Sequence, residues 1–253
     1  MTDSPHSSSP ARAAADARRA IQRMARPPGE FDARRYFRGE VDLGFYNVGT
    51  KPVRQLARSI HASHKHDWPV SQALVFADVL IRDRFLEVKS LGIEVLARYR
   101  RDFTPGLLPT WKRWLADGHS ANWATTDGIC GCLIGPLVAA NPALAGRMRG
   151  WSHHRSLWVR RASIVGLLPA LRRGLPVDLV YTIARTLHSD QEDLIQKAAG
   201  WALREAGKVD PARLERYLRK NGPMIPRTTL RYAIERMPAN KRRQLLISTR
   251  PAD

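Results

Sequence analysis

Proline, glycine, asparagine and aspartate interrupt this chain at short, regular intervals, and that punctuation most limits how it can fold. The segments between the breaks, such as WPVSQALVFADVLIRD and RFLEVKSLGIEVLARYRR, repeat their apolar residues every three or four positions. This spacing puts the apolar residues on one face of an α-helix. Strict alternation and Asn-Gly turns, which indicate strands and hairpins, are essentially missing. The sequence therefore predicts an all-α protein of about ten to twelve helices.

The predicted helices also follow one another in pairs. From about residue 68 onward the pairs recur roughly every 35–45 residues, the period of HEAT- and armadillo-like repeats, although no repeat consensus is strict. Such pairs stack into a curved solenoid whose concave side is an extended binding surface. A helical bundle is the alternative, but many short helices in paired register favour the solenoid.

The first 30 residues have a different character. MTDSPHSSSP has a composition typical of disorder, ARAAADARRAIQRMA can form a helix, and RPPGE ends it. We therefore expect a disordered or partly helical tail over residues 1–30 and one repeat domain over residues 31–253. Within that domain, Thr50 and Asn122 are the expected caps of two helices, and Asn141-Pro142 is expected to begin a short one.

The net charge indicates the kind of partner. Lys and Arg total 42 against 23 acidic residues, which gives a formal charge of +19. Such a surplus favours nucleic acid first and an anionic membrane second, although a bias of genome composition toward arginine could also produce it. There is no apolar run of about 18 residues and no secretory signal, so neither a membrane span nor export is expected. We expect a cytoplasmic monomer that associates with the nucleoid when bound to DNA.

The residues that commonly bind metals do not form a site in the sequence. Cys130 and Cys132 are too few for structural zinc and too close along a helix for a disulfide, so buried free thiols are expected. His61, His64 and His66 do not have a zinc spacing. The sequence therefore predicts no metal site.

One predicted helix carries a carboxylate beside its largest aromatic ring. Trp123 and Asp127 are four residues apart, just over one helical turn, so their side chains should project side by side at the edge of the apolar stripe. An ionised Asp at that position needs partners or an aqueous groove. The alternative is a half-exposed first-turn acid that the helix dipole stabilises.

Cations lie at unusual positions on later helices. Arg161 falls inside an apolar sector, which suggests a ligand for phosphate, or else a side chain whose stem extends to solvent. Trp201 lies at the border of a packing face between Lys197 and Arg204. That arrangement is typical of a nucleic-acid contact, although a single tryptophan at helical spacing is more often part of a core.

These segments together resemble a known family. NWATTD, LWVRRASI and IQKAAGWALRE are similar, in the same order and at similar separations, to the diagnostic segments of the AlkD-type alkylpurine DNA glycosylases. FYNVGTKPVRQLARSI resembles the aromatic-Gly-x-x-Thr/Pro-x-Arg-x-Leu region near the N-terminus of that family. The resemblance covers roughly residues 33–240, and IQKAAGWALRE is its most specific part.

The resemblance implies both a fold and a reaction. The fold is an all-α, right-handed superhelical solenoid of HEAT-like helix pairs, with a basic concave groove for duplex DNA. The reaction is hydrolysis of the N-glycosidic bond of cationic N3- and N7-alkylated purines in double-stranded DNA, without metal or cofactor. The family engages the backbone and the sugar, so no tight pocket for the base is expected.

The resemblance also assigns roles to residues. By position, the catalytic cleft is matched by Trp123, Asp127 and Trp201. Arg161 matches an arginine that faces the DNA backbone, and Lys197 and Arg204 are expected to hold phosphates as well.

The sequence departs from the family beside the matched tryptophan. Asn122 stands where a second tryptophan is frequent, and Ala124 where an acidic residue is frequent. Because of these departures, the resemblance does not indicate which lesion is preferred or how efficient catalysis is. The rival functions are a catalytically inactive repeat protein that binds damaged or branched DNA, and a HEAT-like scaffold for an acidic protein.

Overall fold

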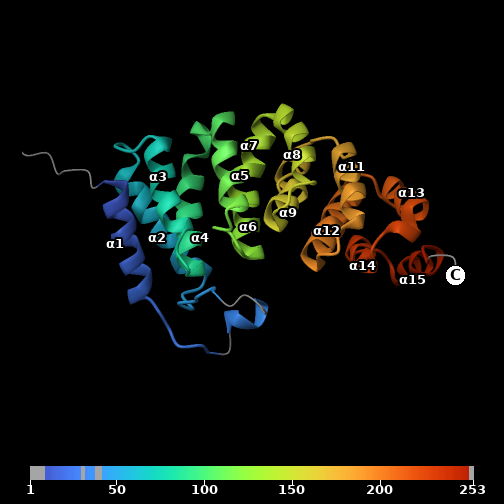
Figure 1. The fold of residues 1–253 in the computed structure, drawn as a ribbon, viewed down its shortest axis with the longest axis horizontal. Helices are drawn as coiled ribbons and strands as arrows, with labels where there is room; N and C mark the ends of the chain where they lie inside the picture. Colours follow the sequence, from blue (N-terminus) through green and yellow to red (C-terminus); the bar gives the residue numbers. More distant parts are fainter. Residues whose placement is uncertain (1–8, 30–31, 38–41, 251–253) are drawn as a thin grey trace, which may run out of the picture. The chain divides into compact units, whose positions relative to one another are not determined.

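The computed structural model describes residues 9–29, 32–37 and 42–250 of the chain (Figure 1). This described part contains helices and loops, and its only extended pairing is an isolated bridge between Gly44 and Phe85. The all-α prediction is therefore confirmed for these residues. The helices are α1 (Pro10–Arg23), η1 (Ala33–Tyr36), α2 (Thr50–His64), α3 (Val70–Ile81), α4 (Leu86–Leu96), η2 (Ala97–Asp102), η3 (Pro105–Leu107), α5 (Leu108–Ala116), α6 (Trp123–Ile129), η4 (Cys130–Ile134), α7 (Gly135–Ala140), η5 (Pro142–Leu144), α8 (Ala145–Trp151), α9 (Leu157–Val165), α10 (Leu168–Leu171), α11 (Asp178–Thr186), η6 (Leu187–Ser189), α12 (Asp193–Val209), α13 (Pro211–Asn221), η7 (Gly222–Met224), α14 (Arg227–Ile234) and α15 (Ala239–Ser248).

The chain divides into two compact units, Met1–Leu133 and Ile134–Asp253. In the first unit, α4 packs against α2, α3 and α6, and its core contains large side chains that are almost fully buried, among them Phe76, Trp111 and Trp114. The right-handed solenoid and its basic concave groove concern both units together and stay a prediction.

The helix expected within the N-terminal tail is present as α1. Pro10 stands at its start, where the missing proline N–H costs no hydrogen bond. Its buried face contacts α3 and α4 through Ala13, Ala14, Ala17 and Ile21. Residues 10–23 therefore contribute to the core of the first unit.

The expected cap of α2 is wrong by one residue. Gly49 is the N-cap, with φ of 76°, and Thr50 is already the first residue of the helix. A positive φ favours glycine over any residue with a Cβ, so the turn into α2 selects Gly49. The short helix expected at Asn141-Pro142 is confirmed as η5, with Asn141 at its N-cap position.

In the second unit, α12 packs against α9, α11, α13 and α14. Gly200 lets α14 come close, because a Cβ at this position would lie 2.5 Å from the carbonyl oxygen of Thr229. The contact is reinforced by Thr229, whose Oγ1 donates a hydrogen bond to the carbonyl of Gln196 at 3.0 Å.

The expectation that no apolar run is long enough to span a membrane is wrong. Among the described residues, one helical run, Trp123–Ala140, has 18 residues and a mean hydropathy of 1.3. It includes α6, the π turn η4 and α7, and η4 precedes Pro136, which cannot donate to the α-helical ladder. Half of the run is buried inside the protein, as in the core helix of a soluble protein, so it is weak evidence for a membrane span.

Candidate functional site

Helix α6 begins with a side-chain cap at Asn122, as the sequence predicts. The Oδ1 of Asn122 accepts a hydrogen bond from the backbone N–H of Thr125 at 2.7 Å, and its own backbone is extended. The hydroxyl of Thr126 donates to the carbonyl of Ser120 at 3.1 Å and ties the preceding loop to the same turn. Because Asn122 and Thr126 are almost fully buried, these bonds are shielded from water. They fix the turn from which Trp123 projects.

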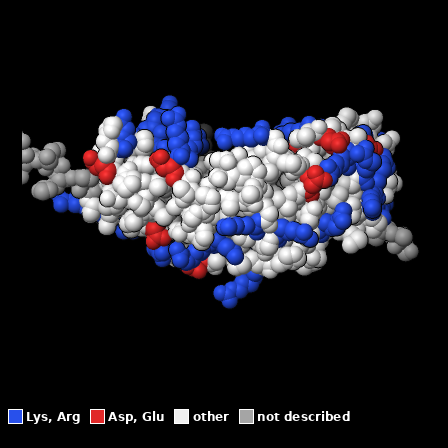
Figure 2. Space-filling model, turned by 90° about the horizontal axis from the view of Figure 1, so that it is seen from above, with Lys and Arg blue, Asp and Glu red and all other residues white. Residues whose placement is uncertain are grey.

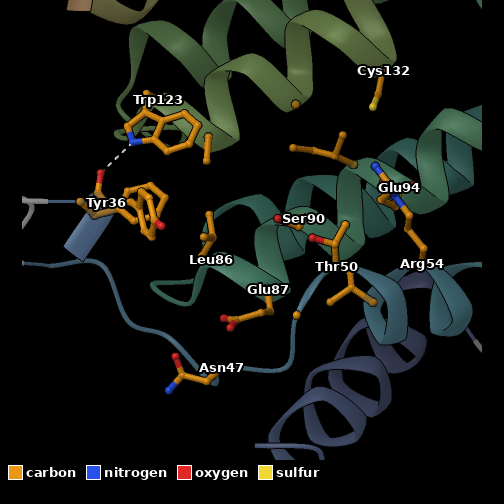
Figure 3. A pocket seen from close by; sticks show the side chains of 16 residues that line it. Tyr36, Asn47, Thr50, Arg54, Leu86, Glu87, Ser90, Glu94, Trp123 and Cys132 are labelled. Carbon is orange, nitrogen blue, oxygen red and sulfur yellow. Dashed lines mark hydrogen bonds and ion pairs between the residues drawn. The ribbon is translucent and has the colours of Figure 1, made fainter. Parts of the chain in front are cut away.

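The indole of Trp123 is held by residues from near the N-terminus. Its Nε1–H donates a hydrogen bond to the carbonyl of Tyr36 at 3.1 Å (Figure 3). Its ring stacks on Phe37 with a centroid distance of 5.1 Å and an angle of 9° between the planes. Phe37 also contacts Phe45, at 5.2 Å between ring centroids. One face of the Trp123 ring is therefore covered by Phe37.

Asp127 lies one turn after Trp123 in the same helix, so the predicted side-by-side placement is confirmed at the level of the backbone. Its side chain is half-buried. Gly128, the residue after it, lines a pocket together with Trp123.

This pocket, here called the α6 pocket, has a volume of about 470 Å³ and lies within the first unit (Figure 3). Helices α2, α4 and α6 supply most of its walls. Its lining residues are Tyr36, Phe37, Asn47, Gly49, Thr50, Val53, Arg54, Leu86, Glu87, Ser90, Ile93, Glu94, Trp123, Ala124, Gly128 and Cys132.

The polar groups of the α6 pocket come mainly from α2 and α4. Arg54 Nε donates to Glu94 Oε1 at 2.8 Å across the two helices. Glu87 is 7% exposed, and its carboxylate accepts hydrogen bonds from the backbone N–H groups of Tyr46 at 3.1 Å and Val48 at 3.4 Å. Glu87 thus fastens the segment before α2 to the first turn of α4.

The cysteines are both free, but only one of them is buried as predicted. Cys130 is buried, whereas Cys132 is half-buried and lines the α6 pocket. Burial raises the pKa of the Cys132 thiol, and the nearby carboxylate of Glu94 raises it further, while Arg54 lowers it. Cys132 therefore enters the pocket as a neutral thiol at neutral pH.

Arg161, the predicted phosphate ligand, is 6% exposed. Its Nη1 donates a hydrogen bond to the carbonyl of Leu194 at 2.6 Å, which joins α9 to the first turn of α12. In this structure the guanidinium thus contributes to packing within the second unit. Its role toward DNA stays a prediction.

The other predicted residues of the second unit lie together on α12. Trp201 is half-buried at the border of the packing face. Lys197 forms an ion pair with Asp193 at 2.6 Å, and Arg204 forms one with Glu235. Both cations therefore have carboxylate partners that a phosphate would have to replace.

Two of the three histidines considered as metal ligands, His61 and His64, form aromatic contacts. His64 stacks on Trp68 at 3.9 Å between ring centroids, and His61 meets Tyr99 edge-on at 5.0 Å. Burial lowers the pKa of both imidazoles. Over the part of the chain that the structure describes, no three potential ligands among His, Cys, Asp and Glu gather at one point.

The sequence does not predict the residues that hold the Trp123 ring, and it does not predict the α6 pocket. Tyr36, Phe37, Glu87 and Glu94 are distant from α6 in the sequence and belong to no motif of their own. The pocket residues on and before α2, namely Asn47, Gly49, Thr50, Val53 and Arg54, do lie in a segment already singled out, FYNVGTKPVRQLARSI, but nothing in that segment indicates a pocket.

Comparison with known proteins adds the family. The family model described as "DNA alkylation repair enzyme" matches residues 17–237. A solved structure titled a predicted DNA alkylation repair enzyme from Enterococcus faecalis is similar in fold, with a TM-score of 0.68 and 17% sequence identity over 90% of this chain and 96% of that chain. No curated protein matches the sequence. The family match spans most of the chain and confirms the resemblance, and the chain belongs to the DNA alkylation repair enzyme family.

Proposed function

We propose that this protein is a DNA glycosylase that hydrolyses the N-glycosidic bond of cationic N3- and N7-alkylated purines in duplex DNA. The observation that carries the proposal is the Trp123–Asp127 pair, one turn apart at the capped start of α6 in a member of this family. The net charge of +19 supports a polyanionic substrate. On the face that Figure 2 shows, Lys and Arg side chains are widespread, with only scattered Asp and Glu between them.

The chemistry requires little from the protein beyond negative potential and a placed water. An N3- or N7-alkylated purine is already positively charged, so it leaves as a neutral base when it takes the electrons of the glycosidic bond. Positive charge then develops on the deoxyribose, as in other glycoside hydrolyses. Water adds to the anomeric carbon and gives up a proton.

Asp127 suits both needs of this reaction. Its carboxylate can stabilise the cationic sugar and orient or deprotonate the attacking water. Trp123 and Trp201 would offer the negative faces of their rings to the same charge, each worth about 0.5–2 kcal/mol when water is excluded. The hydrogen bond to Tyr36 and the stacking on Phe37 fix the Trp123 ring in advance, so little entropy is lost when substrate binds.

DNA binding would use the cations of the second unit. Arg161, Lys197 and Arg204 are the proposed phosphate contacts, and the carboxylates that now pair with Lys197 and Arg204 would be exchanged for phosphates. Such contacts release counterions, so affinity should fall steeply with salt.

Release of free base from duplex DNA containing 7-methylguanine tests the proposal. The wild-type protein should release the base, and Asp127→Asn should abolish release while duplex binding is retained or strengthened. Asp117→Asn is the matched control, because Asp117 is an exposed carboxylate at the end of α5 and its loss changes the net charge equally. It should release base at the wild-type rate.

Other outcomes decide against the proposal. Asp127 is the fifth residue of α6 and lies beyond the first turn, so the alternative of a first-turn acid stabilised by the helix dipole is wrong. If Asp127 has no catalytic role, Asp127→Asn will leave release unchanged. Binding of damaged or branched duplexes without release from any alkylpurine would instead assign the protein as a non-catalytic DNA-binding member of the family.

A further inference from the structure

A further pocket lies in the second unit, where four helices meet. Helices α13 and α14 each contact both α12 and α15, and Figure 1 shows these four helices together at the C-terminal end of the chain. The pocket, here called the α12–α15 pocket, has a volume of about 270 Å³. Leu214 and Met237 are among the apolar residues of its wall. All its lining residues belong to the second unit, so the pocket is formed by that unit alone.

Every charged side chain of the described residues that line this pocket is a cation. Helix α12 supplies Arg204 and Lys208. The loop after α14 supplies Arg236, and α15 supplies Lys241, so the formal charge of the lining is +4. Helix α15 begins at the pocket, and the partial positive charge of its N-terminus adds to that of the side chains. A small cavity with four cations favours an anion with several acceptor oxygens, and phosphate suits both Arg and Lys.

The two cations of α12 can exchange their present partners for such an anion. Lys208 pairs with Glu205 at 2.7 Å, and Glu205 also pairs with Arg172 at 3.5 Å. This second partner matters because Glu205 is 7% exposed, and a buried carboxylate without any partner is costly. The partner of Arg204 is Glu235, which is exposed and would be solvated by water. Neither exchange would leave a buried charge unpaired.

The cations beyond α12 are also available. Lys241 pairs with Glu215, but Arg219 pairs with the same carboxylate at 2.8 Å. Glu215 would therefore keep a partner if Lys241 turned to an anion. Arg236 is exposed and has no carboxylate partner among the described residues. Its guanidinium can bind an anion without giving up another ion pair.

The pocket continues a face of α12 that carries residues already proposed to contact DNA. Lys197, Trp201, Arg204 and Lys208 are separated by four, three and four residues, so they share one side of the helix. Lys208 lies seven residues beyond Trp201, which is about 10 Å along the helix axis. One strand of DNA offers a phosphate about every 3.4 Å of its axis. A duplex lying along this face with its lesion at Trp201 would therefore bring a phosphate a few nucleotides away to the pocket.

We propose that the α12–α15 pocket binds one phosphate group of the DNA backbone, a few nucleotides from the lesion. The proposal goes beyond the proposed function, because only Arg204 is common to both and DNA binding without catalysis would use the same pocket. The family match ends at residue 237, so Lys241 and the whole of α15 lie outside it.

The first experiment measures duplex affinity by fluorescence anisotropy at several salt concentrations. The test variant carries Arg236→Gln and Lys241→Gln. The matched control carries Arg242→Gln and Arg243→Gln, which removes two exposed cations of α15 that do not line the pocket. Circular dichroism verifies that both variants fold.

The pocket variant should lose one phosphate contact. The slope of log K against log salt should therefore become shallower by about one, and affinity at fixed salt should fall about tenfold. The control should stay close to the wild type in both respects. Equal losses in the two variants would show a diffuse basic surface and overturn the proposal.

The second experiment locates the phosphate. Uncharged methylphosphonates replace the phosphates one at a time in a duplex that contains a stable abasic-site analogue, so no catalysis is needed. At one position, a few nucleotides from the abasic site, the wild type should lose about tenfold in affinity. The pocket variant should lose almost nothing there, because its contact is already absent, and both proteins should lose equally elsewhere.

The outcomes separate this proposal from the proposed function. Additive losses at every position would overturn the phosphate pocket, even if calorimetry showed that it takes up inorganic phosphate, and would leave base release untouched. A non-additive position in a wild-type protein that releases no alkylpurine would support the pocket and overturn the glycosylase function.

Discussion

Replacement of Asn122 by alanine tests how much the cap of α6 contributes to the site. Asn122 is 1% exposed, and its Oδ1 accepts from the buried N–H of Thr125 at 2.7 Å. Loss of a cap costs about 1 kcal/mol, and a buried N–H left without an acceptor costs about 1–3 kcal/mol. The Nδ2 of Asn122 has no partner among the described residues, so its removal recovers part of this cost. We expect the free energy of unfolding to fall by about 1–2 kcal/mol.

The assay is urea-induced unfolding followed by circular dichroism, together with the rate of base release from 7-methylguanine duplexes. Asn122→Ser is the control, because its hydroxyl can accept the same hydrogen bond. Asn122→Ala should lose stability and slow release, since the turn that carries Trp123 and Asp127 frays, whereas Asn122→Ser should retain most of both. Equal stability of the two variants would refute the role of the cap.

Further predictions concern packing, pH and the wall of the pocket. Gly200→Ala should lower the free energy of unfolding by about 1–3 kcal/mol, because the added Cβ would collide with the carbonyl of Thr229. Chemical denaturation measures this change, and an unchanged midpoint would show that α14 adjusts freely. Burial lowers the pKa of His188 to about 4, so as the pH falls from about 6.5 toward 4 the unfolded state takes up a proton before the folded state does. Stability should then drop by about 1.4 kcal/mol per pH unit, and His188→Gln should flatten this slope in denaturation series at several pH values. Glu87→Ala should cost about 2 kcal/mol or more, because the N–H groups of Tyr46 and Val48 lose their acceptor, and Glu87→Gln, which keeps one oxygen, should cost less in the same assay.

Local features of the site could be predicted from the sequence because they depend on neighbours in the chain. The cap at Asn122 and the placement of Trp123 and Asp127 one turn apart follow from side-chain chemistry and the helical period. The same rules fail at Thr50, where the turn needs a positive φ that only Gly49 supplies easily.

Contacts between distant segments could not be predicted. The direction of the Arg161 guanidinium depends on where α12 lies. Its hydrogen bond to the carbonyl of Leu194 cannot be predicted from the residues around Arg161 in the sequence. The ion pair between Lys197 and Asp193 could have been predicted, because four residues separate them on one helix. The ion pair of Arg204 could not, because its partner Glu235 lies on another element.

The hydrogen bond from Trp123 to Tyr36 joins residues that are 87 positions apart. Closing a loop of that length is entropically costly and slow compared with forming α6 itself. The orientation of the indole therefore depends on a contact between distant segments, whereas the cap of α6 depends only on neighbours in the chain. A chain shortened to begin at Thr50 would lose Tyr36 and Phe37, and it would also lose α1, whose buried face belongs to the core of the first unit. The N-terminal segment therefore both orients the Trp123 indole and completes that core.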